Sequence, residues 1–504
     1  MPENNHPIKQ LLGQTAIYGL PTIIGRILNY LLVPMYTRVF ATSEYGVVTE
    51  FYAYVALIFV LLLYGMETAF FRFSESENDK HKVFRTAVGS VIISSLGFLI
   101  LTVSFSGHIA GFMGYAGNVD YVVLFAFIIA LDAASAIPFA HLRRQKKALQ
   151  FSLIKIINIG VNIGLNLFFI LLCPFLIRQP LPEWIMMVLN AIYSPEIGVG
   201  YIFISNLAAT LVTFLLLSPV IFRVKLMPDI VLLKRMLNYS WPLLILGVAG
   251  ILNETFGRII LKHLVPTDLD PMAQLGIYGA SYKVAVFMTL FIQTYRYAAE
   301  PFFFEQMKSE NAPKIYAQTM NYFVMFGAVI FLSISLFLDF SILFVGYQFR
   351  EGAPAIPILL LANLFLGIFY NLSVWFKIKD KTKHGAAISC TGVIVTIILN
   401  ILLVPLLGFI GSAWATLACY FVIMVVSYLT GQRHYPVPYQ ITRLFAIVAI
   451  AVTLFIADTH LFSQYTEYEN FRKIGLLAGF VFYITISDRI IRGKLLSILK
   501  TRKG

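Results

Sequence analysis

The sequence predicts an all-α polytopic membrane protein with about fourteen transmembrane helices. Hydrophobic residues make up 59% of the 504 residues and charged residues only 12%, and the mean hydropathy is +0.80. Soluble domains carry about 25% charged residues, so the composition excludes an ordinary soluble domain. The apolar residues are grouped in stretches of about 20 residues, the length that crosses a bilayer.

The order of these stretches gives the expected helices. They are separated by short gaps that contain charged residues, proline or glycine. Gaps of this length leave no room for a folded domain outside the membrane. The expected spans are 11–34, 47–71, 84–105, 119–140, 151–177, 199–222, 236–260, 274–296, 317–338, 355–376, 385–405, 409–430, 441–457 and 471–488.

Lysine and arginine residues occupy every second gap. Of the 38 basic residues, 28 lie in one set of gaps and the two ends of the chain, four lie in the alternate gaps, and six lie within or at the edge of spans. Cytoplasmic loops are enriched in Lys and Arg, so we expect both termini in the cytoplasm. The net charge of +13 then reflects topology beside an anionic leaflet, and no nucleic-acid partner is expected. The basic residues of the alternate gaps are Arg38, Arg178, Lys262 and Arg350.

Similar short segments recur six spans apart, which indicates an internal repeat. Because six is an even number, the two halves have the same orientation in the membrane and form a parallel repeat. We expect a six-helix lobe over 1–222, a second six-helix lobe over 223–432, and two additional helices with a basic tail over 433–504. The matched segments are 18–21 with 239–242, 165–167 with 399–401, and the glycine-led 198–201 with 408–411.

Three motifs occur in a fixed order: Thr-Arg-Val-Phe at 37–40 with Glu-Tyr-Gly at 44–46, LGIYGASYK at 275–283, and GFIGSAWAT at 408–416. With them the chain resembles the polysaccharide or oligosaccharide flippases of the MATE/MOP superfamily over most of residues 8–430. The resemblance implies two six-helix lobes around a cavity that opens alternately to either side.

The resemblance also implies a cargo. This is a lipid-linked oligosaccharide, typically on undecaprenyl diphosphate, moved from the inner to the outer leaflet of a bacterial cytoplasmic membrane for cell-surface polysaccharide biosynthesis. O-antigen of lipopolysaccharide, capsule, exopolysaccharide and cell-wall precursors are equally compatible glycans. Undecaprenyl diphosphate glycans and membrane lipids are the implied partners.

Basic residues within spans are candidates for contact with a diphosphate. A charge in a span costs about 2.5–3.5 kcal/mol on insertion scales, so it normally faces a cavity or a partner. Arg26 lies sixteen residues beyond Gln10, about 24 Å along the first span, and Lys283 occupies a similar place in the second half. Arg38 and Arg258 are repeat-related and lie near span ends, where interfacial anchoring or helix pairing competes with cargo contact.

Carboxylates within spans are candidates for binding a driving H⁺ or Na⁺. Glu254 precedes Arg258 by four residues, the favourable order for a helical ion pair, so mutual neutralisation competes with an ion-coupling role. Asp132 and Glu67 are alternative ion-coupling residues.

One polar stripe lies on the span 151–177. Asn158, Asn162 and Asn166 recur every four residues with Lys155 one turn earlier, so they share one face of a helix. Their amides suit a sugar headgroup, but asparagines also join helices in membrane bundles, and Gly160 and Gly164 supply a GxxxG packing motif. We expect packing and cargo contact in nearly equal measure.

Other functions have weaker support. A MATE-type multidrug antiporter exporting organic cations favours carboxylates over central Arg and Lys. A membrane glycan polymerase or ligase has only the Asp268-Leu269-Asp270 pattern behind it, so no enzyme is expected. The sequence contains no GxxxxGK[ST] phosphate loop, and its three cysteines have neither disulfide nor metal spacing, so no metal or other cofactor is expected. The basic loop 141–147 and the basic tail either determine the orientation of the chain in the membrane or bind anionic lipids or glycan assembly enzymes.

Overall fold

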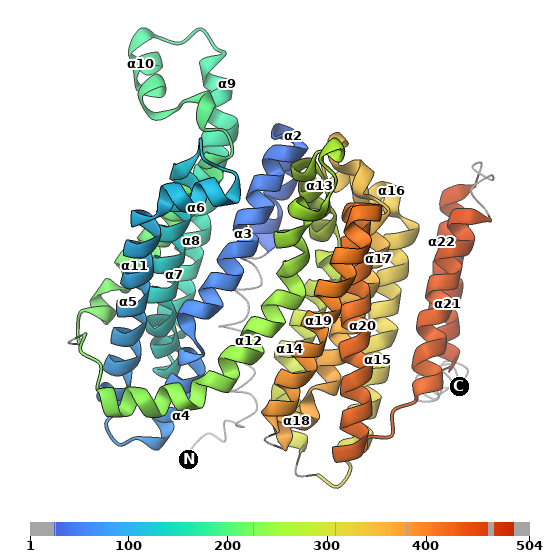
Figure 1. Cartoon of the computed structure of the whole chain (residues 1–504). Helices are drawn as coiled ribbons and strands as arrows, with labels where there is room; N and C mark the ends of the chain where they lie inside the picture. Colours follow the sequence, from blue (N-terminus) through green and yellow to red (C-terminus); the bar gives the residue numbers. More distant parts are fainter. Residues whose placement is uncertain are drawn as a thin grey trace, which may run out of the picture. The chain divides into compact units, whose positions relative to one another are not determined.

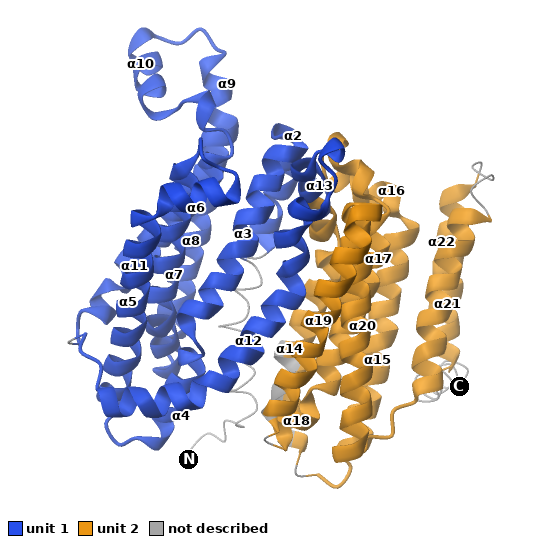
Figure 2. Ribbon diagram, viewed as in Figure 1, with its two compact units in different colours: residues 1–279 blue, residues 280–504 orange. Residues whose placement is uncertain are grey.

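The computed structural model of the 504-residue chain describes residues 25, 27–224, 226–307, 309–379, 381–461 and 468–487. Every element within these ranges is a helix, and no strand occurs there. Contacts divide the chain into two compact units, Met1–Gly279 and Ala280–Gly504 (Figures 1 and 2). The predicted all-α class is confirmed, and the lobe boundaries at 222 and 432 stay predictions.

Unit 1 consists of helices that run along one another and of short connecting helices. Its elements are α2 (Val33–Val39), α3 (Thr42–Leu63), α4 (Met66–Ser76), α5 (Lys80–Ser104), α6 (Ser106–Met113), α7 (Val119–Arg144), α8 (Ala148–Leu167), the π-helix η1 (Phe168–Leu172), α9 (Cys173–Ile177), α10 (Glu183–Ile192), η2 (Pro195–Ile197), α11 (Gly200–Ile221), α12 (Ile230–Leu264), η3 (Thr267–Leu269) and the first part of α13 (Pro271–Val284).

Unit 2 begins within α13. Its further elements are α14 (Val286–Gln306), α15 (Ala312–Leu336), α16 (Leu338–Ser341), η4 (Ile342–Phe344), η5 (Tyr347–Gly352), α17 (Ala355–Leu372), α18 (Val374–Ile378), α19 (Thr382–Leu407), α20 (Phe409–His434), α21 (Ile441–His460) and α22 (Glu469–Ser487).

Eleven helical segments of the described residues are long and apolar enough to cross a membrane. Helices α13 and α14 form a twelfth candidate that is bent by 46°. The protein is therefore a multi-pass membrane protein. The described residues do not confirm the expected number of fourteen spans. Most of the expected span 11–34 lies outside the described residues, and α22, at the expected span 471–488, carries Glu469, Arg472 and Lys473 in its first turns.

Aliphatic side chains on the outer faces of the helices account for the apolar composition. On α5, Ile93, Leu96 and Ile100 are exposed at positions three and four residues apart, and Leu149, Leu153 and Ile156 repeat this pattern on α8. Such a stripe on a transmembrane helix faces lipid. Helices satisfy their own backbone hydrogen bonds, which is why they tolerate this environment.

Aspartate caps begin two helices of unit 1. The Asp79 carboxylate accepts a hydrogen bond from the backbone N–H of Lys82 at the start of α5, and Asp229 accepts one from Leu232 at the start of α12. Lys82 also lies 2.9 Å from Asp229, which joins the ends of α5 and α12. The caps satisfy backbone donors that a helix N-terminus leaves open.

Glycines allow α3 and α13 to cross at backbone contact. A Cβ atom added at Gly276 would lie 1.9 Å from the Thr42 carbonyl oxygen, and one at Gly46 would lie 2.2 Å from the Met272 carbonyl oxygen. Gly46 and Gly276 belong to two of the sequence motifs described above. The close crossing of α3 and α13 therefore explains why both motifs contain glycine at these positions.

Two pairs of residues support the internal repeat. Gly198, two residues before α11, and Gly408, directly before α20, both adopt positive φ, with φ/ψ of 49/−123° and 56/−137°. Asn166 and Asn400 are both fully buried, and each donates its side-chain amide to the backbone carbonyl one turn earlier, at 2.7 and 2.8 Å. Equivalent positions of the two predicted halves thus share backbone and hydrogen-bond geometry.

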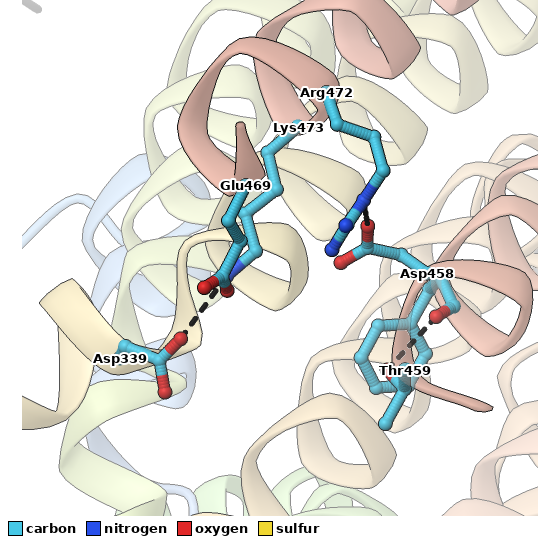
Figure 3. Close-up of polar contacts among 7 residues, drawn as sticks. Asp339, Asp458, Thr459, Glu469, Arg472 and Lys473 are labelled. Atoms are coloured by element: carbon cyan, nitrogen blue, oxygen red, sulfur yellow. Dashed lines mark hydrogen bonds and ion pairs between the residues drawn. The ribbon is translucent and has the colours of Figure 1, made fainter. Parts of the chain in front are cut away.

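Ion pairs join α22 to neighbouring helices of unit 2 (Figure 3). Arg472 lies 2.7 Å from Asp458 of α21. Lys473 lies 3.0 Å from Asp339 of α16 and 2.5 Å from Glu469. The charged first turns of α22 therefore have protein partners.

Candidate functional site

The structure describes three of the four predicted basic residues. Arg26 lies outside the described residues. Arg38 is exposed at the end of α2, and its guanidinium donates to the Pro34 carbonyl oxygen at 2.8 Å. This contact lies within its own helix.

Lys283 lies at the last turn of α13, directly before the 46° bend to α14. Residues 275–282 are all buried, whereas Lys283 is exposed. Ser281 donates to the Gly352 carbonyl oxygen at 3.0 Å, which holds this turn against η5. The fold thus presents a cationic side chain from a buried, fixed turn beside a break in a transmembrane helix.

Arg258 and Glu254 form the predicted ion pair on α12. Their closest N···O distance is 3.5 Å, and Arg258 also donates to the Glu254 carbonyl oxygen at 3.1 Å. The Arg258 side chain is largely buried, while Glu254 is exposed. The pair places a cation and a carboxylate together within a span.

Glu67 of α4 forms an ion pair with Arg143 at the end of α7. The basic loop that begins here packs on its own unit, since Arg143 and Arg144 lie over the rings of Phe71 and Phe70. The basic tail after 487 lies outside the described residues. These contacts give Glu67 and Arg143 structural partners.

Asp132 of α7 belongs to a polar network between the helices of unit 1. The carboxyl group of Asp132 lies beside the Thr210 hydroxyl of α11 and within electrostatic reach of Lys155 on α8. Asn206 of α11 continues the network, donating its amide to the Tyr52 hydroxyl of α3 at 2.6 Å. Four helices therefore contribute to the surroundings of one intramembrane carboxyl group.

The asparagine stripe of α8 faces other helices. Asn158 donates to Thr213 of α11 and Asn162 donates to Asn29, both at 2.9 Å. The Tyr36 hydroxyl donates to Asn166 at 2.8 Å. These hydrogen bonds favour the packing interpretation of the amides.

The GxxxG motif has no such role among the described residues. A Cβ atom added at Gly160 or Gly164 would meet no described atom within 4 Å. Among the described residues, the asparagines and not these two glycines make interhelical contacts.

Sequence reasoning missed a buried ion pair in unit 1. Glu50 of α3 is fully buried, and its Oε1 lies 2.5 Å from Nζ of Lys262 on α12. Lys262 also donates to the Met113 carbonyl oxygen at 2.7 Å, and the Tyr115 hydroxyl donates to Glu50 at 2.6 Å. Burial and the Glu50 carboxylate raise the pKa of Tyr115, so it remains a donor. The signal was available, because Glu50 is an ionisable residue within a predicted span.

The Asp268-Leu269-Asp270 pattern has a structural role at its second aspartate. Asp270 accepts hydrogen bonds from the backbone N–H groups of Met272 and Ala273, each at 3.2 Å, at the start of α13. A helix cap accounts for this aspartate.

Solved structures similar to this chain include a lipid flippase and MATE transporters. The lipid II flippase MurJ in an inward closed conformation matches with a TM-score of 0.70 and 14% identity, covering 95% of this chain and 99% of the flippase. An inward-facing multidrug resistance MATE transporter of the MOP superfamily matches with a TM-score of 0.61 and 14% identity, covering 83% and 97%. A MATE transporter from Vibrio cholerae gives a TM-score of 0.57 and 11% identity, covering 84% and 95%.

Sequence comparisons identify the family. A comparison with curated proteins finds no match. The family model described as "Polysaccharide biosynthesis protein" matches residues 11–307, more than half of the 504-residue chain. At 14% identity the solved neighbours show the fold of this chain, and it agrees with the helical transporter-like fold that the sequence resemblance implies. The chain therefore belongs to the polysaccharide biosynthesis protein family, on a fold similar to that of the lipid II flippase and the MATE transporters.

Proposed function

We propose that this protein is a flippase that moves a polyprenyl diphosphate oligosaccharide from the inner to the outer leaflet by alternating access. The polysaccharide biosynthesis family and the fold similar to a lipid II flippase support a transported glycan lipid. The basic gaps favour a bacterial cytoplasmic membrane with both termini in the cytoplasm. Its partners are then the glycan on an undecaprenyl-type diphosphate, membrane lipids and the enzymes that assemble the glycan.

The observation that carries the proposal is the setting of Lys283. Transporters bind substrate where transmembrane helices are interrupted, and α13 and α14 meet at a 46° bend next to this residue. A cation in a span is costly unless it serves a partner or a cargo. An exposed lysine beside a helix break suits a diphosphate, for which it acts as a point charge.

Other residues extend the proposed substrate contacts. Arg258 is paired with Glu254, and a diphosphate replaces this carboxylate as its partner when cargo binds. Arg26 and Arg38 are the additional cationic contacts, and Asn158 and Asn162 supply amides to the sugar when their interhelical hydrogen bonds open.

We infer that Asp132 is the ion-coupling residue for H⁺ or Na⁺. Glu67 and Glu254 each have an arginine partner, whereas Asp132 has a hydrogen bond with the Thr210 hydroxyl and Lys155 within electrostatic reach. Loss or gain of a cation at Asp132 changes the charge that Lys155 faces, which links ion binding to the packing of α7, α8 and α11. Asp132→Asn is expected to abolish the ion dependence of transport while leaving lipid binding intact.

Native mass spectrometry of lipids that co-purify with the protein tests the cargo. Wild type is expected to retain a polyprenyl diphosphate glycan, and Lys283→Ala is expected to lose most of it. Lys314→Ala serves as the matched control, because Lys314 is an exposed lysine in the first turn of α15. Equal retention by Lys283→Ala and wild type, or equal loss in both variants, contradicts the proposed role of Lys283.

A multidrug antiporter gives a different result. If purified protein holds no glycan lipid and instead binds organic cations saturably, with binding lost in Asp132→Asn, the fold serves drug export. Transfer of glycan between lipid carriers by the purified protein would instead indicate a polymerase or ligase.

A further inference from the structure

Helix α10 exposes a continuous apolar stripe. The stripe begins at Trp184 and continues three, four and eight residues later with Met187, Val188 and Ile192. These spacings place the four side chains on one helix face. Their exposed fractions are 68, 74, 53 and 46%. Leu189 is buried on another side of α10, so the helix packs on its own unit while the stripe faces outward.

Aromatic stacking fixes the depth of α10 in the membrane. Tyr193, directly after α10, stacks on Tyr201 with ring centroids 5.2 Å apart, and Tyr201 stacks on Phe169 at 4.5 Å. The Ser194 backbone N–H donates to the Tyr201 hydroxyl at 2.7 Å. Tyr201 is the second residue of α11, whose 22 residues span about 33 Å, close to the thickness of the hydrocarbon core. The end of α10 therefore lies at the boundary between hydrocarbon and headgroups.

The connection from α9 limits how far the start of α10 can lie from this boundary. Phe175 of α9 is exposed and lies six residues beyond Phe169, about 9 Å further along the helix, so the apolar outer surface continues from the hydrocarbon edge into the headgroup layer. Residues 178–182 join α9 to α10, and five residues reach at most about 17 Å. Figure 1 shows α9 and α10 at the end of unit 1 opposite α4.

The charges around α10 point to apolar burial and not to electrostatic attraction. The stripe contains no charged residue, and the segment from 178 to 199 carries one arginine, Arg178, and two glutamates, Glu183 and Glu196. Interfacial helices typically place Trp and aliphatic residues in the boundary layer. With a segment net charge of −1, anionic lipids give no added attraction.

We propose that α10 is an interfacial helix that inserts Trp184, Met187, Val188 and Ile192 into the membrane boundary on the side opposite the basic loops. Its partner is the lipid surface of the outer leaflet, independent of the identity of the cargo. The helix anchors the connection between α9 and α11 at a fixed depth.

Fluorescence of Trp184 in lipid nanodiscs tests this inference. In a variant with Trp241, Trp375 and Trp414 replaced by Phe, Trp184 is the remaining tryptophan. Its emission is expected to be blue-shifted, quenched strongly by phosphatidylcholine carrying a doxyl group near the headgroup and weakly by a doxyl group at the chain end. Acrylamide quenching is expected to be severalfold weaker than for a tryptophan in water, and replacing a fraction of the phosphatidylcholine with phosphatidylglycerol is expected to change nothing.

The matched control moves the probe to the opposite face. Asn190 is exposed on the polar side of α10, so Asn190→Trp in a Trp184→Phe background is expected to be quenched by acrylamide and not by the doxyl lipids. Equal acrylamide access at the two positions overturns the proposal. Protection of Trp184 without doxyl quenching also overturns it, because a protein surface or a second copy then covers the stripe.

A second measurement avoids the core substitution Trp375→Phe. A nitroxide attached at Met187→Cys is expected to be accessible to oxygen and shielded from a water-soluble nickel chelate. The same label at Asn190→Cys is expected to show the reverse. Chelate access at both positions contradicts membrane insertion.

Discussion

The Nζ of Lys262 lies 2.5 Å from Oε1 of Glu50, between two helices of unit 1, and the Glu50 side chain is fully buried while that of Lys262 is 9% exposed. The Met113 carbonyl and the Tyr115 hydroxyl supply further hydrogen bonds to the lysine and the carboxylate. The pair thus fastens α3, α12 and the α6–α7 connection at one point. A buried pair with this many partners is costly to break but need not be costly to replace.

Removing one partner of this pair is expected to destabilise the protein strongly. Lys262→Met leaves Glu50 buried without its cation, which costs about 3–5 kcal/mol. The measurement is thermal unfolding in a constant detergent or nanodisc. Glu50→Gln is expected to have a similar effect.

The double variant Glu50→Gln/Lys262→Met provides the control. It removes both charges, so it is expected to be more stable than Lys262→Met alone. Additive losses in the double variant would show that each side chain acts through its packing and not through the pair.

The crossing of α3 and α13 is expected to reject a methyl group. Gly276→Ala places a Cβ 1.9 Å from the Thr42 carbonyl oxygen, and backbone on both sides must shift, at a cost of about 1–3 kcal/mol. Unfolding temperature is expected to fall. Gly164→Ala is the control, because its Cβ meets no described atom within 4 Å and alanine favours a helix by about 1 kcal/mol. Equal effects of the two substitutions contradict the close crossing.

The fold class followed from the sequence because lipid imposes a simple rule on composition. Long apolar segments must become helices, and their spacing was readable from the gaps. The repeat was readable where backbone geometry demands particular residues, as at Gly198 and Gly408. The count of spans was less predictable, because charged residues such as Arg472 and Lys473 obscure the start of α22 and their partners lie on other helices.

The candidate site was predictable only in part. The pair Glu254–Arg258 was readable because it lies within one helix. The partner of Glu67 is Arg143, 76 residues away, and that of Asp132 is Thr210, 78 residues away. Glu50 pairs with Lys262, 212 residues away. A single sequence does not show which residues so far apart in the chain are close in space. Whether an asparagine joins helices or faces a cavity likewise depends on the neighbours that tertiary packing brings to α8.

The two ion pairs of α22 are expected to contribute unequally. Asp458 is buried beside Arg472, whereas Asp339 is 86% exposed beside Lys473. Asp458→Asn removes a carboxylate from a partly desolvated pair, while Asp339→Asn removes one that water already screens, worth less than about 1 kcal/mol. Hydrogen exchange is expected to accelerate in α21 and α22 for Asp458→Asn and to change little for Asp339→Asn. Equal acceleration in both variants would rule out the difference in burial as the cause.

The cap of α12 is expected to make stability depend on pH at the acid end. The backbone N–H of Leu232 and the ammonium group of Lys82 hold the pKa of Asp229 below its usual 3.8. Because the folded-state pKa is depressed, the ionised cap stabilises the folded protein above the unfolded-state pKa, and this contribution is lost as pH falls through the folded-state value. The stability difference between wild type and Asp229→Ala is therefore expected to be constant above about pH 5 and to shrink below about pH 4.

The companion variant Lys82→Met separates the two causes of this pKa shift. It removes the ion pair at 2.9 Å but leaves the hydrogen bond from Leu232, which is the larger cause. Its stability is expected to fall less than that of Asp229→Ala and to retain part of the acid dependence. The measurement is a thermal unfolding series over pH for the three proteins. A larger loss in Lys82→Met than in Asp229→Ala would mean that Lys82 acts through another group and that the cap is not the dominant contact.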